Sequence, residues 1–67
     1  MIVYKKFDGG AVIALWPSEP WDNKGNIASY MRIGQHSGAM PELVDELEDA
    51  TPEEYSELQR ELNRLGY

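Results

Sequence analysis

Hydrophobic residues gather in two short runs at the start of the chain. Residues 2–7 (IVYKKF) are rich in β-branched and aromatic side chains, Asp8-Gly9-Gly10 follows, and residues 11–16 (AVIALW) form the second run. Two such runs around an Asp-Gly turn are typical of a β-hairpin. Because the second run is apolar at every position, it predicts a central strand covered on both faces. A helix can cover one face; loops, a dimer contact or a bound partner are the alternatives for the other.

The middle of the chain predicts a third strand between two loops. Residues 17–21 (PSEPW) are expected to break the second strand, and residues 23–26 (NKGN) are typical of a turn with Gly25 at positive φ. Residues 27–33 alternate, which predicts a half-buried strand with Tyr30 on the face opposite Met31. Residues 34–38 (GQHSG) are expected to form a loop.

The C-terminal third begins with an ambiguous segment. Pro41 suits a first helical position, and Leu43 and Leu47, four residues apart, permit a short helix. Residues 45–49 fit either the continuation of that helix or a fourth, edge strand, and the pattern leaves both open.

The last element is a helix over residues 52–65. Thr51-Pro52-Glu53-Glu54 has the form of a capping box with proline at N1. An apolar stripe with helical spacing follows, formed by Tyr55, Leu58, Leu62 and Leu65, and Gly66 supplies a stop. We therefore expect one α+β domain over residues 1–67: a three-stranded antiparallel sheet, with a fourth edge strand as an alternative, packed by one C-terminal helix.

Negative charge is concentrated in the same third of the chain. Residues 42–61 hold nine carboxylates and one base, in a chain whose net charge is −6. Such a field repels nucleic acid and anionic lipid and attracts basic protein surfaces. Glu53 and Glu54 suit the positive end of the helix dipole, and a solvated acidic surface is the simplest interpretation of the other carboxylates. The functional interpretation is a partner-binding face, with these candidate residues: Glu42, Asp45, Glu46, Glu48, Asp49, Glu57 and Trp21.

Composition excludes several kinds of site. The chain has no cysteine and one histidine, so disulfides and thiolate metal sites are excluded, and we expect no metal and no cofactor. No run approaches the roughly 20 apolar residues of a membrane span. We expect a soluble cytoplasmic protein that binds neither nucleic acid nor membrane.

Catalytic motifs are weak. His36 is the one histidine of the chain, but Gly34-Gln35-His36-Ser37-Gly38 is not a G-x-S-x-G elbow, because its serine is one place late. A structural turn histidine is the favoured role, and we expect no enzyme.

Trp16 is expected to close the core, while Trp21 suits an interface anchor.

The segments YMRIGQHSG, ATPEEYSEL and the terminal LGY carry a resemblance. Over residues 27–67 the chain is similar to small uncharacterised proteins of bacterial prophages and mobile elements, which often have histidine where this chain has Arg32. The resemblance implies a bacterial or phage source and no activity.

Three functions remain as hypotheses. The first is a non-enzymatic acidic module that docks on the basic, nucleic-acid-binding surface of a host protein, as an inhibitor of the anti-CRISPR or anti-restriction kind. The second is a small homodimeric accessory protein, joined through the second strand or the tryptophan loop. A His36-centred enzyme is the third.

Overall fold

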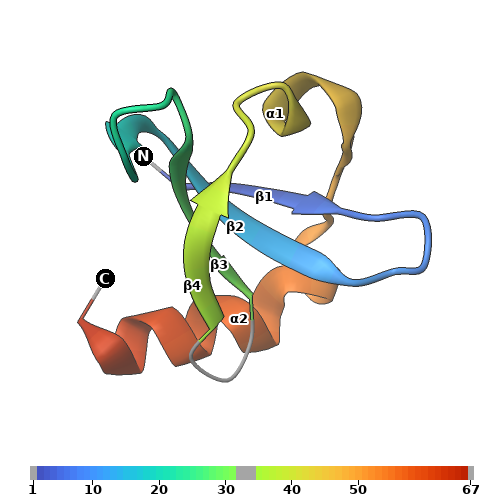
Figure 1. Ribbon diagram of the computed structural model, residues 1–67. Helices are drawn as coiled ribbons and strands as arrows, with labels where there is room; N and C mark the ends of the chain where they lie inside the picture. Colours follow the sequence, from blue (N-terminus) through green and yellow to red (C-terminus); the bar gives the residue numbers. More distant parts are fainter. Residues whose placement is uncertain (1, 32–34, 67) are drawn as a thin grey trace.

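The computed structural model describes residues 2–31 and 35–66, and in these residues the chain forms one antiparallel sheet and two helices. The strands stand side by side in the order β4-β3-β2-β1-β5. Figure 1 labels β1 to β4. In chain order, the elements are β1 (Val3–Lys6), β2 (Val12–Pro20), β3 (Ile27–Met31), β4 (Gln35–Ala39), α1 (Leu43–Glu46), β5 (Glu48–Asp49) and α2 (Pro52–Leu65). The expected α+β class, with an antiparallel sheet and a C-terminal helix, is confirmed.

The central strand β2 is covered on both faces, and the chain itself provides both covers. On one face Ala14 and Trp16 form a buried cluster with Leu58 and Leu62 of α2. On the other face Ile13 and Leu15 belong to a second cluster. The second cluster is completed by Ile27 and Ala39 and by the partly buried Phe7, Met31, Leu43, Val44 and Leu47. Successive side chains of a strand point to opposite faces, so the uninterrupted apolar run fills two cores at once.

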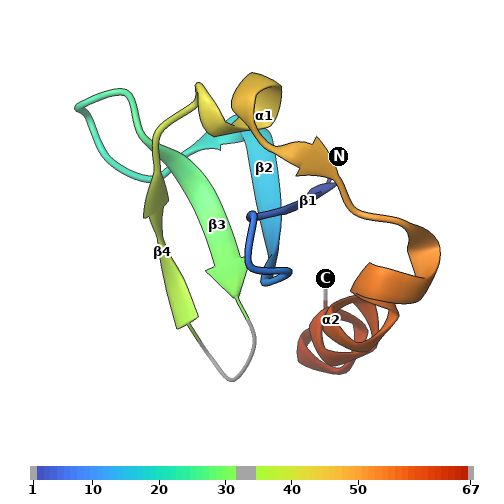
Figure 2. The ribbon, with the colours of Figure 1, turned by 90° about the vertical axis from the view of Figure 1, so that its right-hand side faces the viewer.

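The two helices accordingly lie on opposite sides of the sheet (Figure 1, Figure 2). Helix α2 crosses one face, where the ring of Tyr55 also stacks on that of Tyr4 of β1, with 4.2 Å between the ring centroids. The short helix α1 and the residue after it cover the other face. Coverage by the chain's own segments removes the need for a dimer contact at the second strand.

Helix α2 spans the residues that the sequence predicts. The Thr51 hydroxyl accepts from the Glu54 backbone N–H, and the Glu54 carboxylate accepts from the Thr51 N–H, so the capping box is complete. Gly66 ends the helix in the left-handed region, with φ of 98°. Both ends are set by local chemistry.

The ambiguous segment resolves into both alternatives. Helix α1 is a single turn, and Pro41 lies before its cap, Glu42, rather than at the first helical position. Residues 48–49 then form a two-residue edge strand, β5, which pairs with Lys5 and Lys6 of β1.

Three sequence expectations are wrong. Residues 35–38 are not a loop, because they belong to β4, whose Ser37 lies opposite Ser29 of β3. The buried Ser29 hydroxyl donates to the Ser37 carbonyl at 2.8 Å, so this polar pairing is satisfied.

The prolines do not end β2, which runs to Pro20 with an irregularity after Trp16. Tyr30 is 1% exposed because α2 covers its face, so β3 is not half-buried. The predicted continuation of the third strand through Arg32 and Ile33 lies outside the described residues.

Candidate functional site

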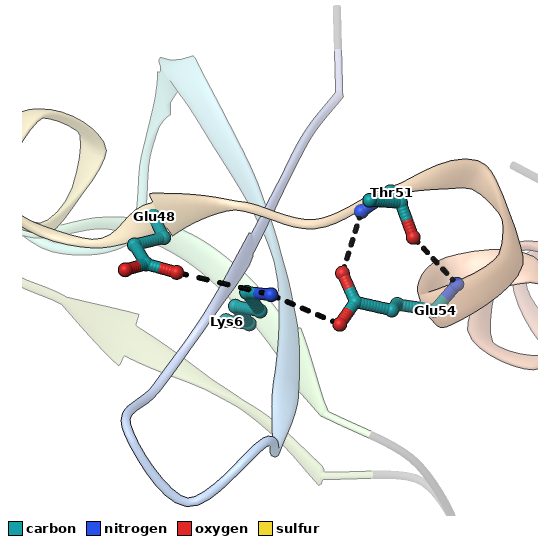
Figure 3. Close-up of polar contacts among 4 residues, drawn as sticks. All are labelled: Lys6, Glu48, Thr51 and Glu54. Atoms are coloured by element: carbon teal, nitrogen blue, oxygen red, sulfur yellow. Dashed lines mark hydrogen bonds and ion pairs between the residues drawn. The ribbon is translucent and has the colours of Figure 1, made fainter.

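The two lysines of β1 decide which carboxylates of the acidic segment are neutralised. Lys5 Nζ lies 2.6 Å from Asp49 Oδ1, and Lys6 Nζ lies 3.8 Å from Glu48 Oε2. Each pair is set by the register, which places Lys5 opposite Asp49 and Lys6 opposite Glu48. Lys6 Nζ also lies 3.0 Å from Glu54 Oε2, as Figure 3 shows. Three of the acids therefore have a basic neighbour that is remote in sequence.

The same contacts perturb two ionisable groups. The Thr51 backbone N–H, and after it the Lys6 ammonium, holds the pKa of the Glu54 carboxyl below its ordinary value. The Glu54 carboxylate raises the pKa of Lys6 in turn. Both shifts favour the charged forms, as expected for an opposite charge at hydrogen-bond distance.

The remaining candidates are not gathered into one face. Glu42, Asp45 and Glu46 are exposed on and beside α1, and Glu57 is exposed on α2, across the sheet from them. Within residues 2–31 and 35–66, the side chains of these four acids make no ion pair. The candidate acids predicted from the sequence therefore separate into three groups: a free set at α1, a paired set at β5, and Glu57.

Glu57 lies in a groove between α2 and the β1–β2 hairpin, of about 410 Å³. On the sheet side it is lined by residues 10–12, which lead from the hairpin turn into the first residue of β2, and by Met31 at the end of β3. Helix α2 contributes a lining of one apolar and three acidic residues, namely Glu54, Glu57, Leu58 and Glu61. We refer to the whole groove, with its lining from the sheet side and from α2, as the acidic groove.

The three carboxylates of the acidic groove differ in their environment. Glu54 is engaged by the helix cap and by Lys6. Glu61 is half-buried and accepts a hydrogen bond from the buried Tyr30 hydroxyl. Glu57 has no polar side-chain partner in the described part of the chain. It is the carboxylate most available to a ligand, and one turn of helix places it beside the other two.

His36 and Trp21, the other singled-out residues, lie away from this groove. His36 is in β4, where its ring contacts Trp16 and Tyr30, so it is a strand residue in an aromatic cluster rather than a turn histidine. Trp21 is 48% exposed, directly after β2. Both line a smaller pocket with Trp16, Glu19 and Ala28.

No group of three metal-ligating side chains occurs among the residues that the structure describes. In the same residues, neither helix has the length and apolarity that a membrane span requires. Comparison with protein-family models, curated proteins and solved structures gives no match for this chain. The similarity to prophage and mobile-element proteins therefore stays a prediction.

Sequence reasoning selected Glu57 but missed the groove around it. The groove depends on the approach of the hairpin to α2, which joins residues more than 40 positions apart. The sequence did hold a signal for the pairing of Glu48 and Asp49 with β1. An edge strand at 45–49 needs a neighbouring strand, and Lys5-Lys6 is the basic strand segment whose charge complements the two acids.

Proposed function

We propose that this protein is a non-enzymatic binding module whose acidic groove receives a lysine or arginine side chain from the basic surface of a protein partner. The observation that supports this most is the position of Glu57 on the wall of a groove that also has apolar lining residues. Glu57 is an exposed carboxylate without a polar side-chain partner among residues 2–31 and 35–66. A partner that normally binds nucleic acid presents such side chains.

The groove suits both parts of a long basic side chain. Val12, Met31 and Leu58 offer apolar surface for its methylene stem, and Glu57 and Glu61 offer negative charge for its head. Lysine and arginine bury their stems along apolar surface while the charged end stays at a polar or hydrated position. A solvated acidic face, the simplest alternative, requires no apolar lining beside the carboxylates.

The charge distribution supports a partner with positive charge over one with phosphate groups. Lys5 and Lys6 are engaged with Asp49, Glu48 and Glu54, so neither is available to phosphate without breaking an ion pair. The net charge of −6 speeds association with basic surfaces and opposes contact with nucleic acid.

The proposal is tested by affinity capture with two matched baits. Glu57→Gln and Asp45→Asn each remove one exposed carboxylate and change the net charge from −6 to −5. Quantitative mass spectrometry of the proteins retained from a bacterial lysate should show a basic partner that the Glu57→Gln bait loses and the Asp45→Asn bait keeps. Loss with Asp45→Asn alone would place the binding surface at α1 and refute the groove. Retention by both baits would refute a role for either carboxylate.

A further inference from the structure

A second concave site lies on the same face of the sheet as the acidic groove. Val12, in the groove, and Trp16, in the second site, both belong to the α2-side cluster of β2. They are four positions apart, which is about 13 Å along β2. The second site has a volume of about 230 Å³ and is lined by Trp16, Glu19, Trp21, Ala28 and His36. We refer to it as the aromatic pocket.

Ring contacts fix the inner side of the aromatic pocket. The His36 ring is nearly parallel to that of Trp16, at 26° and with 6.1 Å between centroids. It meets the Tyr30 ring edge-on, at 65° and 4.6 Å. Because Trp16 and Tyr30 are both buried, they hold the exposed His36 in place.

The outer aromatic, Trp21, is held by backbone contacts on both sides. Its indole lies so close to Gly38 of β4 that a Cβ atom at position 38 would be 2.4 Å from Cδ1 of the indole. Its backbone N–H donates to the Asn26 carbonyl at 2.8 Å, which closes the loop between β2 and β3. Asp22 strengthens that loop by accepting from the backbone N–H groups of Lys24 and Asn26. Trp21 is therefore exposed but preorganised, which lowers the cost of binding.

Charge and size together indicate the kind of ligand. Glu19 is exposed at the pocket and has no ion pair within residues 2–31 and 35–66, and aromatic ring faces also attract cations. A guanidinium group combines stacking on tryptophan with hydrogen bonds to a carboxylate, so arginine suits this pairing. The volume is below the roughly 300–1,000 Å³ of small-molecule pockets, which favours one side chain over a whole ligand.

The sheet edge beside the aromatic pocket offers a way to present that side chain. Strand β4, which carries His36 and Gly38, stands at the end of the strand order, and β3 is its one neighbour among the described strands. An exposed edge can pair with an extended peptide, whose backbone then supplies affinity while a side chain enters the adjacent pocket.

We propose that the aromatic pocket binds an arginine side chain of an extended peptide segment that pairs with the edge of β4. The site does not depend on the acidic groove, and its ligand is an extended segment rather than a folded basic surface. Because Trp16 and Trp21 are the two tryptophans of the chain, binding has an intrinsic optical and NMR signal.

The test uses a short, strand-forming peptide with one central arginine and a second peptide in which citrulline, a neutral isostere, replaces it. Tryptophan fluorescence and the two indole N–H NMR signals report binding to the full chain. The arginine peptide should bind at least about tenfold more tightly than the citrulline peptide, and Glu19→Gln should remove most of that difference. Trp21→Ala should weaken binding of the arginine peptide about tenfold.

Two further comparisons keep the outcome decisive. Glu57→Gln should leave the indole shifts of the arginine peptide, and the affinity that they report, unchanged, because both tryptophans line the aromatic pocket and neither lines the acidic groove. A failure at the aromatic pocket and a failure at the acidic groove are therefore seen separately. Amide shifts along β4 should accompany the indole shifts. Equal affinity for arginine and citrulline, absence of any indole shift at millimolar peptide, or indole shifts without β4 shifts would each overturn the proposal.

Discussion

Lys6 of β1 and Glu54 of α2 join the sheet to the C-terminal helix, with 3.0 Å between Nζ and Oε2 (Figure 3). The other carboxylate oxygen of Glu54 accepts the Thr51 backbone N–H at 2.8 Å. One side chain therefore caps the helix and ties it to the first strand. Glu48, Asp49 and Glu54 are therefore acids with a structural role. Glu42, Asp45, Glu46 and Glu57 make no ion pair among the described residues and are the acids available to a partner.

The lowered pKa of Glu54 predicts loss of stability in acid. A carboxyl whose pKa is lower in the folded chain binds protons more weakly there, so its stabilisation is present above the unfolded pKa and is lost as pH falls through the folded pKa. We expect the free energy of unfolding to decline below about pH 4.

Glu54→Gln should make that decline shallower, as measured by urea unfolding at a series of pH values. Asp22, whose pKa is lowered by the Asn26 side-chain amide and then by the Lys24 backbone N–H, should account for part of the remaining slope. An unchanged slope in Glu54→Gln would contradict the assignment.

Removal of the helix cap should destabilise the chain measurably. Thr51→Ala deletes the hydroxyl that accepts the Glu54 N–H, and loss of such a cap costs about 1 kcal/mol. Ser56→Ala is the matched control, because the Ser56 hydroxyl donates only to the Glu53 carbonyl within the helix. Thermal and urea unfolding should place the control within about 0.5 kcal/mol of the parent chain. Equal losses for both variants would argue against the capping box as a specific contribution.

The packing of α2 gives a second matched pair. Leu62 is 1% exposed and packs against β2 and β3, whereas Leu65, one turn further on, is 55% exposed. Leu62→Ala should cost about 2–5 kcal/mol, a large part of the stability of so small a domain, and Leu65→Ala less than about 0.5 kcal/mol. Chemical unfolding distinguishes them, and a Leu65→Ala loss as large as that of Leu62→Ala would show that the helix packs on a different face.

Gly38 should control the position of Trp21. Gly38→Ala introduces a Cβ atom where the indole lies, so we expect the ring to leave its place and its fluorescence to shift to longer wavelength. Gly9→Ala is the control, because a Cβ atom there meets no heavy atom within 4 Å. An unshifted spectrum in Gly38→Ala, with the fold retained, would contradict the packing of Trp21 on β4.

Locally determined features of this fold could be predicted from the sequence. The capping box at Thr51, the apolar stripe and Gly66 gave the bounds of α2, because each depends on residues close in the chain. Strands β4 and β5 were harder. Residues 35–39 lack the alternation of a half-buried strand, and β5 has two acidic residues; both are strands because of partners elsewhere, β3 and β1.

The candidate site was predictable to the same limited extent. The excess of acid over base in residues 42–61 is readable from the sequence alone, and Glu57 is both a sequence candidate and a lining residue of the acidic groove. The neutralisation of Glu48 and Asp49 required the register between β1 and β5, and the separation of Glu42, Asp45 and Glu46 from Glu57 required the position of the sheet between the helices. Pairings between distant segments were missing from the sequence argument.

The central claim is that the acidic groove at Glu57 recognises a basic side chain, and NMR titration with a defined probe tests it most directly. A short peptide with a single lysine should shift the amide signals of Ala11, Glu57 and Leu58, which line the groove. Its acetyl-lysine counterpart, which lacks the charge, should shift them much less. Glu57→Gln should abolish the difference between the peptides, whereas Asp45→Asn, with the same net charge, should preserve it. Equal shifts with both peptides, or loss of the difference in Asp45→Asn rather than Glu57→Gln, would contradict the claim.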